Sequence, residues 1–294
     1  MPESAISSGH AARFCHLCGR RLAGRYYRHS NGIVFCSACH SSRPRCVRCD
    51  SPLDDAMLAR GASLPPGEPR LCGQCMRSTP RCAACHKRIT GSWYTFEELL
   101  PPDAVRRFCE QCVQKRPRCD ICRVPVGSNA APLDDGQYRC SLCAGEMVLG
   151  EVEVRATYED ALAAFRQVTG EALRQTPRME VVSRLQMGEV RRRYEGRVTV
   201  GTGIPNTAGS GAAGHHVLGF YVRSHGGSTI YVERALPRSL LLGTLAHELG
   251  HAWQAERAPD VRDALICEGF AEWVAHHVLV ERGLRPMAAR ATRR

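Results

Sequence analysis

Two histidines and a glutamate near the carboxyl end of the sequence have the spacing of a metal site. His247 and His251 are four residues apart, so on a helix both imidazoles share one face and can ligate the same zinc ion. Glu248 follows His247 directly, where its carboxylate can take a proton from a water held by that ion. The pattern predicts a hydrolytic zinc site. The alternative is a buried helix whose two histidines make ordinary hydrogen bonds.

A zinc site of this kind needs a third protein ligand and leaves a fourth position open for water. Residues 264–275 are predicted to form a second amphipathic helix, with Glu268 and Glu272 one turn apart. Glu268 is the expected third ligand, because Gly269 beside it would let the two helices approach closely. Glu272 is expected to accept the remaining N–H of one of the two histidines. The alternative for Glu272 is a solvated helix charge.

The cysteines form an internal repeat upstream of this site. Of 17 cysteines, 16 lie in eight Cys-x-x-Cys pairs, and only Cys267 stands alone. The pairs group into four modules that are always separated by six residues, whereas the loop inside each module varies, so each module is expected to close its own zinc site. The expected ligands are Cys15, Cys18, Cys36 and Cys39; Cys46, Cys49, Cys72 and Cys75; Cys82, Cys85, Cys109 and Cys112; and Cys119, Cys122, Cys140 and Cys143.

Four thiolates fill the coordination sphere of zinc, so these four zinc ions are expected to be structural. Each module has too few apolar residues to fold without metal. The aromatic residues of the modules, Trp93 and Tyr94 among them, are expected to form a minimal core beside each zinc; the alternative is that they form a binding surface. Disulfides are not expected, because the start of the sequence lacks the apolar core of a signal peptide. Redox-active dithiols would need a single such pair opening a helix after a strand, not eight repeated copies.

The composition changes after the last cysteine pair, which indicates a multidomain chain. The expected parts are a disordered stretch 1–12, a zinc-ribbon or LIM-like array 13–146, an α+β domain 150–284 and a basic tail 285–294. In the α+β domain the pattern predicts helices at 158–168 and 184–194, strands near 179–183 and 197–200, a loop at 201–214, a hairpin of 217–223 with 228–233, and a helix that Pro237 opens.

Two stretches of the chain resemble a known family of peptidases. They are residues 230–253, which end in Leu-Ala-His-Glu-Leu-Gly-His-Ala-Trp, and the Glu268-Gly269 pair seventeen residues after His251. The order of hairpin, His-Glu-x-x-His helix and glutamate helix is similar to the gluzincin branch of zinc metallopeptidases. It resembles most the plant organ-size regulators, which are LIM-domain, ubiquitin-activated peptidases. The resemblance implies a zincin-like fold, with the two histidines and Glu268 as zinc ligands and Glu248 as general base.

The chain also departs from that family. All sixteen expected structural ligands are cysteines, whereas LIM domains include histidine and aspartate and join their two zinc sites by a two-residue linker. The chain has no counterpart of the family's ubiquitin-interacting helices, so activation by ubiquitin is not carried over. Cys267 stands where the family has a second acidic residue.

The expected function is therefore that of a zinc-dependent endopeptidase with one catalytic and four structural zinc ions. The array would recruit a protein partner or the protein or peptide substrate. The strand 228–233 is expected to pair with an extended substrate along its edge. Tyr231, His215, His216 and His225 are candidates to stabilise the oxyanion, and the sequence does not single out one of them. The alternative is a zinc-finger adaptor or nucleic-acid-binding regulator with an inactive zincin-like domain.

The formal charge of +11 suggests a nucleic-acid partner, but the cysteines weaken that argument. Sixteen thiolates with four Zn²⁺ carry about −8, which leaves about +3, and a fifth zinc ion makes about +5. Nucleic-acid binding stays open without being favoured. No run of eighteen apolar residues occurs, so no membrane partner is expected and a cytoplasmic location is expected.

Overall fold

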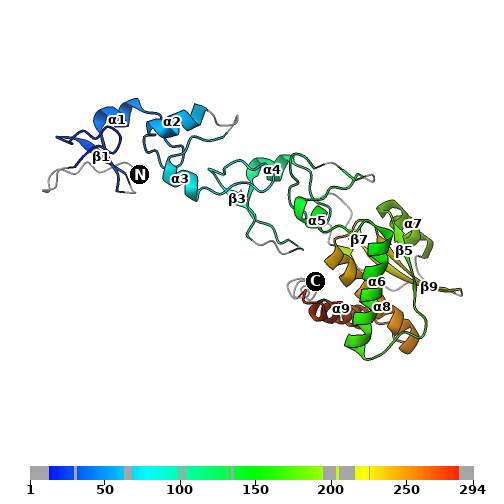
Figure 1. Cartoon of the computed structure of the whole chain (residues 1–294). Helices are drawn as coiled ribbons and strands as arrows, with labels where there is room; N and C mark the ends of the chain where they lie inside the picture. Colours follow the sequence, from blue (N-terminus) through cyan, green and yellow to red (C-terminus); the bar gives the residue numbers. More distant parts are fainter. Residues whose placement is uncertain are drawn as a thin grey trace. The chain divides into compact units, whose positions relative to one another are not determined.

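The computed structural model describes residues 13–29, 32–62, 68–98, 100, 104–130, 132–133, 136–194, 203–204, 216–224 and 226–284 (Figure 1). The chain forms two compact units. The first comprises residues 1–95 and 106–114, and the second comprises residues 96–105 and 115–294. Among the described helices, none combines the length and the apolar character that crossing a bilayer requires.

The first unit contains three of the four cysteine modules and short elements of secondary structure. These are β1 (Tyr26–Arg28), β2 (Val34–Cys36), α1 (Ser37–Ser42), α2 (Asp55–Ala62), α3 (Gly73–Ser78), β3 (Trp93–Tyr94), β4 (Phe108–Cys109) and α4 (Glu110–Lys115). Strands β1 and β2 form one antiparallel pair, and β3 and β4 form another. Trp93 and Tyr94 are 47% and 40% exposed, so the expectation that they form a core beside the third zinc is wrong.

All four modules begin with the same tight turn, which explains the sequence repeat. In the third module the N–H of Cys82 donates to the carbonyl of Lys87, and the Cys82 carbonyl accepts from the N–H of His86, both at 2.8 Å. The equivalent bonds occur at Cys15, Cys46 and Cys119. The fifth residue of the turn has a positive φ in every module: 68° at Gly19, 57° at Asp50, 61° at His86 and 63° at Arg123.

The second unit contains the fourth module and the α+β part of the chain. Its elements are α5 (Ser141–Gly145), α6 (Glu151–Thr169), β5 (Arg178–Val182), α7 (Arg184–Tyr194), β6 (Gly203–Ile204), β7 (His216–Val217), β8 (Gly219–Ser224), β9 (Gly227–Glu233), α8 (Arg238–Arg257) and α9 (Ala264–Glu281). The main sheet has the order β5-β9-β8, with β5 parallel and β8 antiparallel to β9, and β6 pairs with β7.

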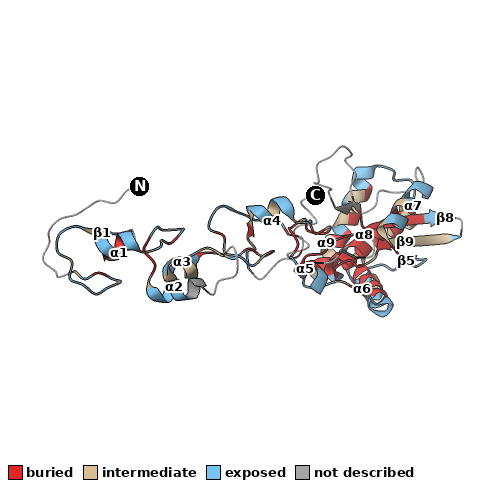
Figure 2. Cartoon of the chain, turned by 90° about the horizontal axis from the view of Figure 1, so that it is seen from above, coloured by how far each residue is buried: buried red, intermediate tan, exposed pale blue. Residues whose placement is uncertain are grey.

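Helix α8 is the centre of the second unit. It packs against α9, α6 and strand β8, and most of its residues are buried, as Figure 2 shows. Leu245 and Leu249 on α8 are fully buried, as are Ile230 on β9 and Val274 on α9. Asp263 directly precedes helix α9, and its carboxylate accepts the backbone N–H groups of Leu265 and Ile266 and so caps the helix. The long helices that carry the candidate ligands are therefore fixed by a common core.

The structure agrees with the predicted helices, with strand β5 and with the β8–β9 hairpin. It corrects the role of the segment 228–233, because β9 lies between β5 and β8 and its two edges are already paired. An added strand cannot use β9. The predicted strand 197–200 and all but two residues of the predicted loop 201–214 lie outside the described residues.

The close approach of α8 and α9 occurs at Gly250 and not at Gly269, which corrects the expectation from sequence. A Cβ on Gly250 would lie 2.9 Å from the Cα of Ala271 and 3.3 Å from its Cβ. A Cβ on Gly269 would meet no atom within 4 Å. The helices touch almost backbone to backbone because Gly250 has no side chain.

This contact predicts opposite effects for two glycine-to-alanine substitutions. Gly250→Ala should lower the free energy of unfolding of the second unit by about 1–2 kcal/mol, since overpacking outweighs the helix propensity gained. Gly269→Ala, the matched control, should raise it by about 0.5–1 kcal/mol, because alanine gains helix propensity without a clash. Urea unfolding followed by circular dichroism measures both. Equal effects of the two substitutions would contradict the assigned contact.

Candidate metal centre

Helices α8 and α9 bring together His247, His251 and Glu268. Nε2 of His247 lies 3.2 Å from Oε2 of Glu268, and Nε2 of His251 lies 3.3 Å from Oε1 of the same carboxylate. The two Nε2 atoms are 3.0 Å apart. Both histidines are 1% exposed, whereas the Glu268 side chain is partly open to solvent. The three residues predicted as ligands therefore form one cluster that could hold a metal ion.

The geometry and chemistry of this cluster fit a zinc ion. Ligands about 2.0–2.1 Å from a tetrahedral zinc stand about 3.3 Å from one another, close to the observed spacings. Two imidazole nitrogens and a carboxylate are also the donor set of catalytic zinc sites, and three protein ligands leave one position open. The zinc ion would be held by Nε2 of both histidines and by the Glu268 carboxylate.

The electrostatics of the cluster favour a positive charge. Burial alone lowers the pKa of His247, but its hydrogen bonds with Glu268 and Glu272 outweigh burial and raise the pKa to about 10. Burial raises the pKa of Glu268, yet the two histidines lower it to about 2. A metal ion must displace the proton of His247 to bind, so the affinity of the site for zinc should increase with pH up to that pKa.

Glu248 is held beside the cluster by the sheet. Its side chain is fully buried, and a Cβ built on Gly219 of β8 would lie 3.1 Å from Oε1 of Glu248 and would overlap the methyl group of Thr244. Glycine at position 219 thus lets the backbone of β8 approach the carboxylate closely. The predicted general base therefore lies between the helix that carries the histidines and strand β8.

Two further side chains orient the histidines. Oε1 of Glu272 lies 3.5 Å from Nδ1 of His247, on the side of the ring expected from sequence, but this nitrogen makes no hydrogen bond of ordinary geometry. Oε1 of Gln254 lies 3.0 Å from Nδ1 of His251, and Nε2 of Gln254 donates to the carbonyl of Cys267 at 3.0 Å. Gln254 thereby joins one histidine to the residue that precedes Glu268. The sequence reasoning missed Gln254, although its position three residues after His251 on the same helix was a usable signal.

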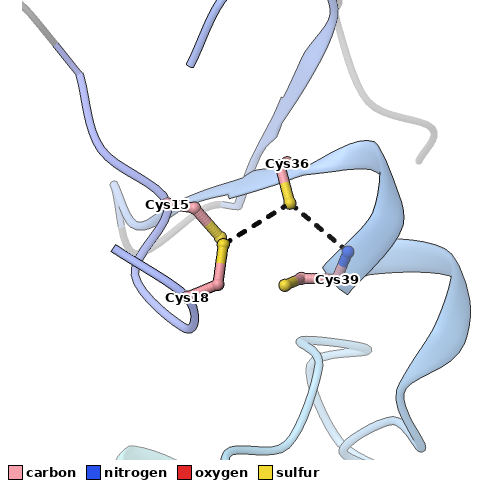
Figure 3. Close-up of side chains that lie close together, drawn as sticks. All are labelled: Cys15, Cys18, Cys36 and Cys39. Carbon is pink, nitrogen blue, oxygen red and sulfur yellow. Dashed lines mark hydrogen bonds between the residues drawn. The ribbon is translucent and has the colours of Figure 1, made fainter. Parts of the chain in front are cut away.

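The four cysteine modules also fit zinc. The sixteen cysteines form the four separate clusters expected, so each module supplies its own four sulfur atoms. Figure 3 shows the first cluster, with its side chains directed toward one another from the first turn and from the β2–α1 junction. Sulfur atoms lie 3.9 Å apart in Cys18–Cys36 and 3.6 Å apart in Cys122–Cys140. Four sulfurs about 2.3 Å from a tetrahedral zinc stand about 3.8 Å apart.

The four thiols of the fourth cluster can all be deprotonated at the same time only if a cation balances their charge. Hydrogen bonds from the neighbouring thiols lower the pKa of Cys140 far below its ordinary value. Hydrogen bonds among the same sulfurs raise the pKa of Cys143 far above it. Some of the four thiols therefore keep their protons unless a divalent ion replaces them, so these residues could hold a structural zinc.

The structure does not bring any of the four residues predicted to stabilise the oxyanion to the metal centre within the described part of the chain. Tyr231 is half-buried on β9 and packs against an apolar cluster that includes Val182, Met187 and Phe220. His215 and His225 lie outside the described residues, and the side chain of His216 does as well. The structure therefore assigns no oxyanion donor.

Comparison with known proteins adds no identification. The sequence matches no protein-family model, and neither the curated proteins nor the solved structures give a significant match.

Removing the carboxylate ligand should empty one site only. Glu268→Ala should lower the metal content from five ions per chain to four, because the four cysteine clusters are untouched. Inductively coupled plasma mass spectrometry of purified protein measures the count. Glu281→Ala, which removes an exposed carboxylate at the end of the same helix, is the control and should leave five. Five ions in the Glu268→Ala variant would exclude Glu268 as an essential ligand.

Removing the acceptor for His251 should weaken the site without abolishing it. Gln254→Leu is expected to lower zinc affinity about 10- to 100-fold, because loss of a hydrogen-bond partner frees the imidazole to rotate. Gln254→Glu keeps an acceptor for Nδ1 but loses the donor to the Cys267 carbonyl, so it should retain more affinity than the leucine variant and less than the wild type. Competition with a chromophoric chelator measures both. An unchanged affinity in the leucine variant would show that Gln254 does not position the ligand.

Proposed function

We propose that the second unit is a zinc-dependent peptidase of the gluzincin type. The observation that carries the proposal is the combination of a His-His-Glu cluster with a buried carboxylate, Glu248, whose negative charge helps to raise the pKa of His247 in that cluster. The four cysteine clusters each offer four ligands, whereas this cluster offers three and leaves room for a water molecule. The resemblance of residues 230–253 and of the Glu268-Gly269 pair to gluzincins supports the same reading.

The residues of the chain have separate roles in the proposed reaction. Zinc, when bound, supplies a Lewis acid that polarises a carbonyl and lowers the pKa of water. Glu248 accepts the proton of the attacking water and later returns it to the leaving amine. Its burial between α8 and β8 holds the carboxylate in place. Glu272 and Gln254 keep the rings of His247 and His251 in orientation.

Strand β8 is the edge that we assign to substrate binding. Within the described residues, Gly219–Ser224 pairs with β9 on one side and with no strand on the other. Its first residue, Gly219, lies against Glu248. An extended peptide added along β8 would therefore bring a backbone carbonyl near the general base. This assignment replaces the one made from sequence, which placed the substrate on β9.

The first unit is proposed to recruit a protein partner or the substrate. Its third module exposes the aromatic side chains of Trp93 and Tyr94, with the guanidinium of Arg107 5.5 Å from the centre of the Trp93 ring. Aromatic and arginine side chains are enriched in protein interfaces, so this surface supports recruitment.

A conservative change of the general base tests the proposal. Glu248→Gln should reduce peptide hydrolysis about 10²- to 10⁴-fold, because the amide cannot accept the proton. Its zinc content should stay the same, since Glu248 is not a ligand. Cleavage of a proteome-derived peptide library, read by mass spectrometry, measures the loss. Glu281→Gln, an exposed change on α9, is the control. Hydrolysis by Glu248→Gln at the wild-type rate would refute the mechanism.

A further inference from the structure

The fourth cysteine module differs from the other three in its surroundings. All four of its cysteines are buried, whereas each of the other clusters has at least two partly exposed or exposed cysteines. It belongs to the second unit, together with the candidate metal centre, whereas the cysteines of the first three modules belong to the first unit; of those three modules only the loop 96–105 inside the third is part of the second unit. The sequence repeat gives no hint of this difference, because the spacing of the cysteines is common to all modules.

The segment that follows Cys143 holds the beginning of α8. The backbone N–H of Arg238, the first residue of α8, donates to the carbonyl of Glu146 at 2.8 Å, and Oγ of Ser239 lies 3.4 Å from Oε2 of Glu146. The N–H of Val148 donates to the carbonyl of Leu236 at 3.0 Å. The last helix of the fourth module, α5, ends at Gly145, directly before Glu146.

These contacts replace a cap that α8 cannot make for itself. The residue before the helix is Pro237, which has no side-chain acceptor, and the first turn of α8 contains no acidic residue. The free N–H groups and the positive end of the helix dipole therefore need partners from elsewhere. Glu146 provides both a carbonyl and a carboxylate. The start of the helix that bears His247 and His251 thus depends on where the fourth module places Glu146.

The same module also holds the end of β9, the strand that leads into α8. Nε2 of Gln137 donates to Oε1 of Glu233 at 3.0 Å, and the guanidinium of Arg139 lies 3.8 Å from the same oxygen. The side chains of Arg139 and Glu233 are 2% and 0% exposed. A carboxylate so deeply buried is tolerated only with its partners in place. Arg139 directly precedes Cys140 and Gln137 lies three residues before it, so a metal ion at this cluster would fix the segment that carries both of them.

We propose that the metal ion of the fourth module is a structural part of the proposed peptidase, and that the His247–His251–Glu268 centre forms only when this metal is bound. The fourth module then acts as a metal-dependent clamp on β9 and α8. The first three modules do not affect the centre in this way. The proposal extends the proposed function, since it concerns how the same metal centre is assembled, but its test does not require that the protein cleave peptides.

Two matched cysteine substitutions in the full-length chain test the clamp. Cys119 and Cys82 each open a module and are each 0% exposed. Cys82→Ser should lose one metal ion and keep four, whereas Cys119→Ser should lose two, its own and that of the histidine centre, and keep three. In the Cys119→Ser variant the amides of α8 should also exchange hydrogen many-fold faster than in Cys82→Ser. Four ions in both variants, with equal exchange in α8, would overturn the proposal.

A milder substitution covers the case in which Cys119→Ser does not fold. Glu146→Ala keeps every cysteine and removes only the carboxylate at the start of α8. It should retain the metal of the fourth module, while the first-turn amides of α8 exchange several-fold faster and zinc binds the histidine centre several-fold more weakly. Glu110→Ala, an exposed glutamate that opens α4 in the third module, is the control. Glu146→Ala with wild-type exchange and wild-type zinc affinity would refute the clamp.

The test also separates this proposal from the proposed activity. If the wild-type protein hydrolyses no peptide but the two cysteine variants differ in metal count and in α8 exchange as stated, the clamp stands and the peptidase fails. If the protein hydrolyses peptides and Cys119→Ser hydrolyses them at the rate of Cys82→Ser with four ions bound, the peptidase stands and the clamp fails.

Discussion

The contact between α8 and α9 at Gly250 is the constraint on which the candidate centre depends. His247 lies one turn before this glycine and His251 lies one residue after it. The side chains of the helix that packs against Gly250 are therefore the ones that lie closest to the two imidazoles. Ala271 fills the contact, and Glu268 stands one turn earlier on the same helix. Because side chains one turn apart share a face, close approach at Gly250 brings the Glu268 carboxylate to the two histidines. The cluster follows from backbone proximity, and Gln254 then reinforces it across the two helices.

Two different kinds of metal donor set occur in the one chain. The cysteine clusters supply four sulfurs each and need the ion to hold together segments that bury little apolar surface. The histidine cluster is built on helices that already have a core, so there the protein positions the ligands. The fourth module has features of both kinds of site. It offers four sulfur ligands, and it is also part of a packed core, because its sulfurs are buried and its flanking residues contact β9 and α8.

The sequence predicted which candidate ligands cluster, because residues a few positions apart are brought together by local backbone geometry. Two residues on one helical turn, or two cysteines on one tight turn, are brought together by the backbone alone, so His247 with His251 and each Cys-x-x-Cys pair could be read directly. The helices 158–168 and 184–194 and the hairpin were also predictable from periodicity. What could not be read was which glycine makes the helix contact and which strand lies at the edge of the sheet. Both depend on contacts between distant segments, which is why Gly250 and strand β8 emerged only from the structure.

The residue with a positive φ at the fifth position of each first turn is a place where the four modules can differ in stability. A positive φ costs a residue with a side chain about 1–2 kcal/mol, and glycine avoids most of this cost. The first module has Gly19 at this place, whereas the other three have Asp50, His86 and Arg123. A metal ion bound by the cysteines would have to hold those three turns in this conformation, most of all at Arg123. A single non-ligand position thus tunes how tightly each module retains its ion, so copies of one motif can differ in the metal concentration at which they fold.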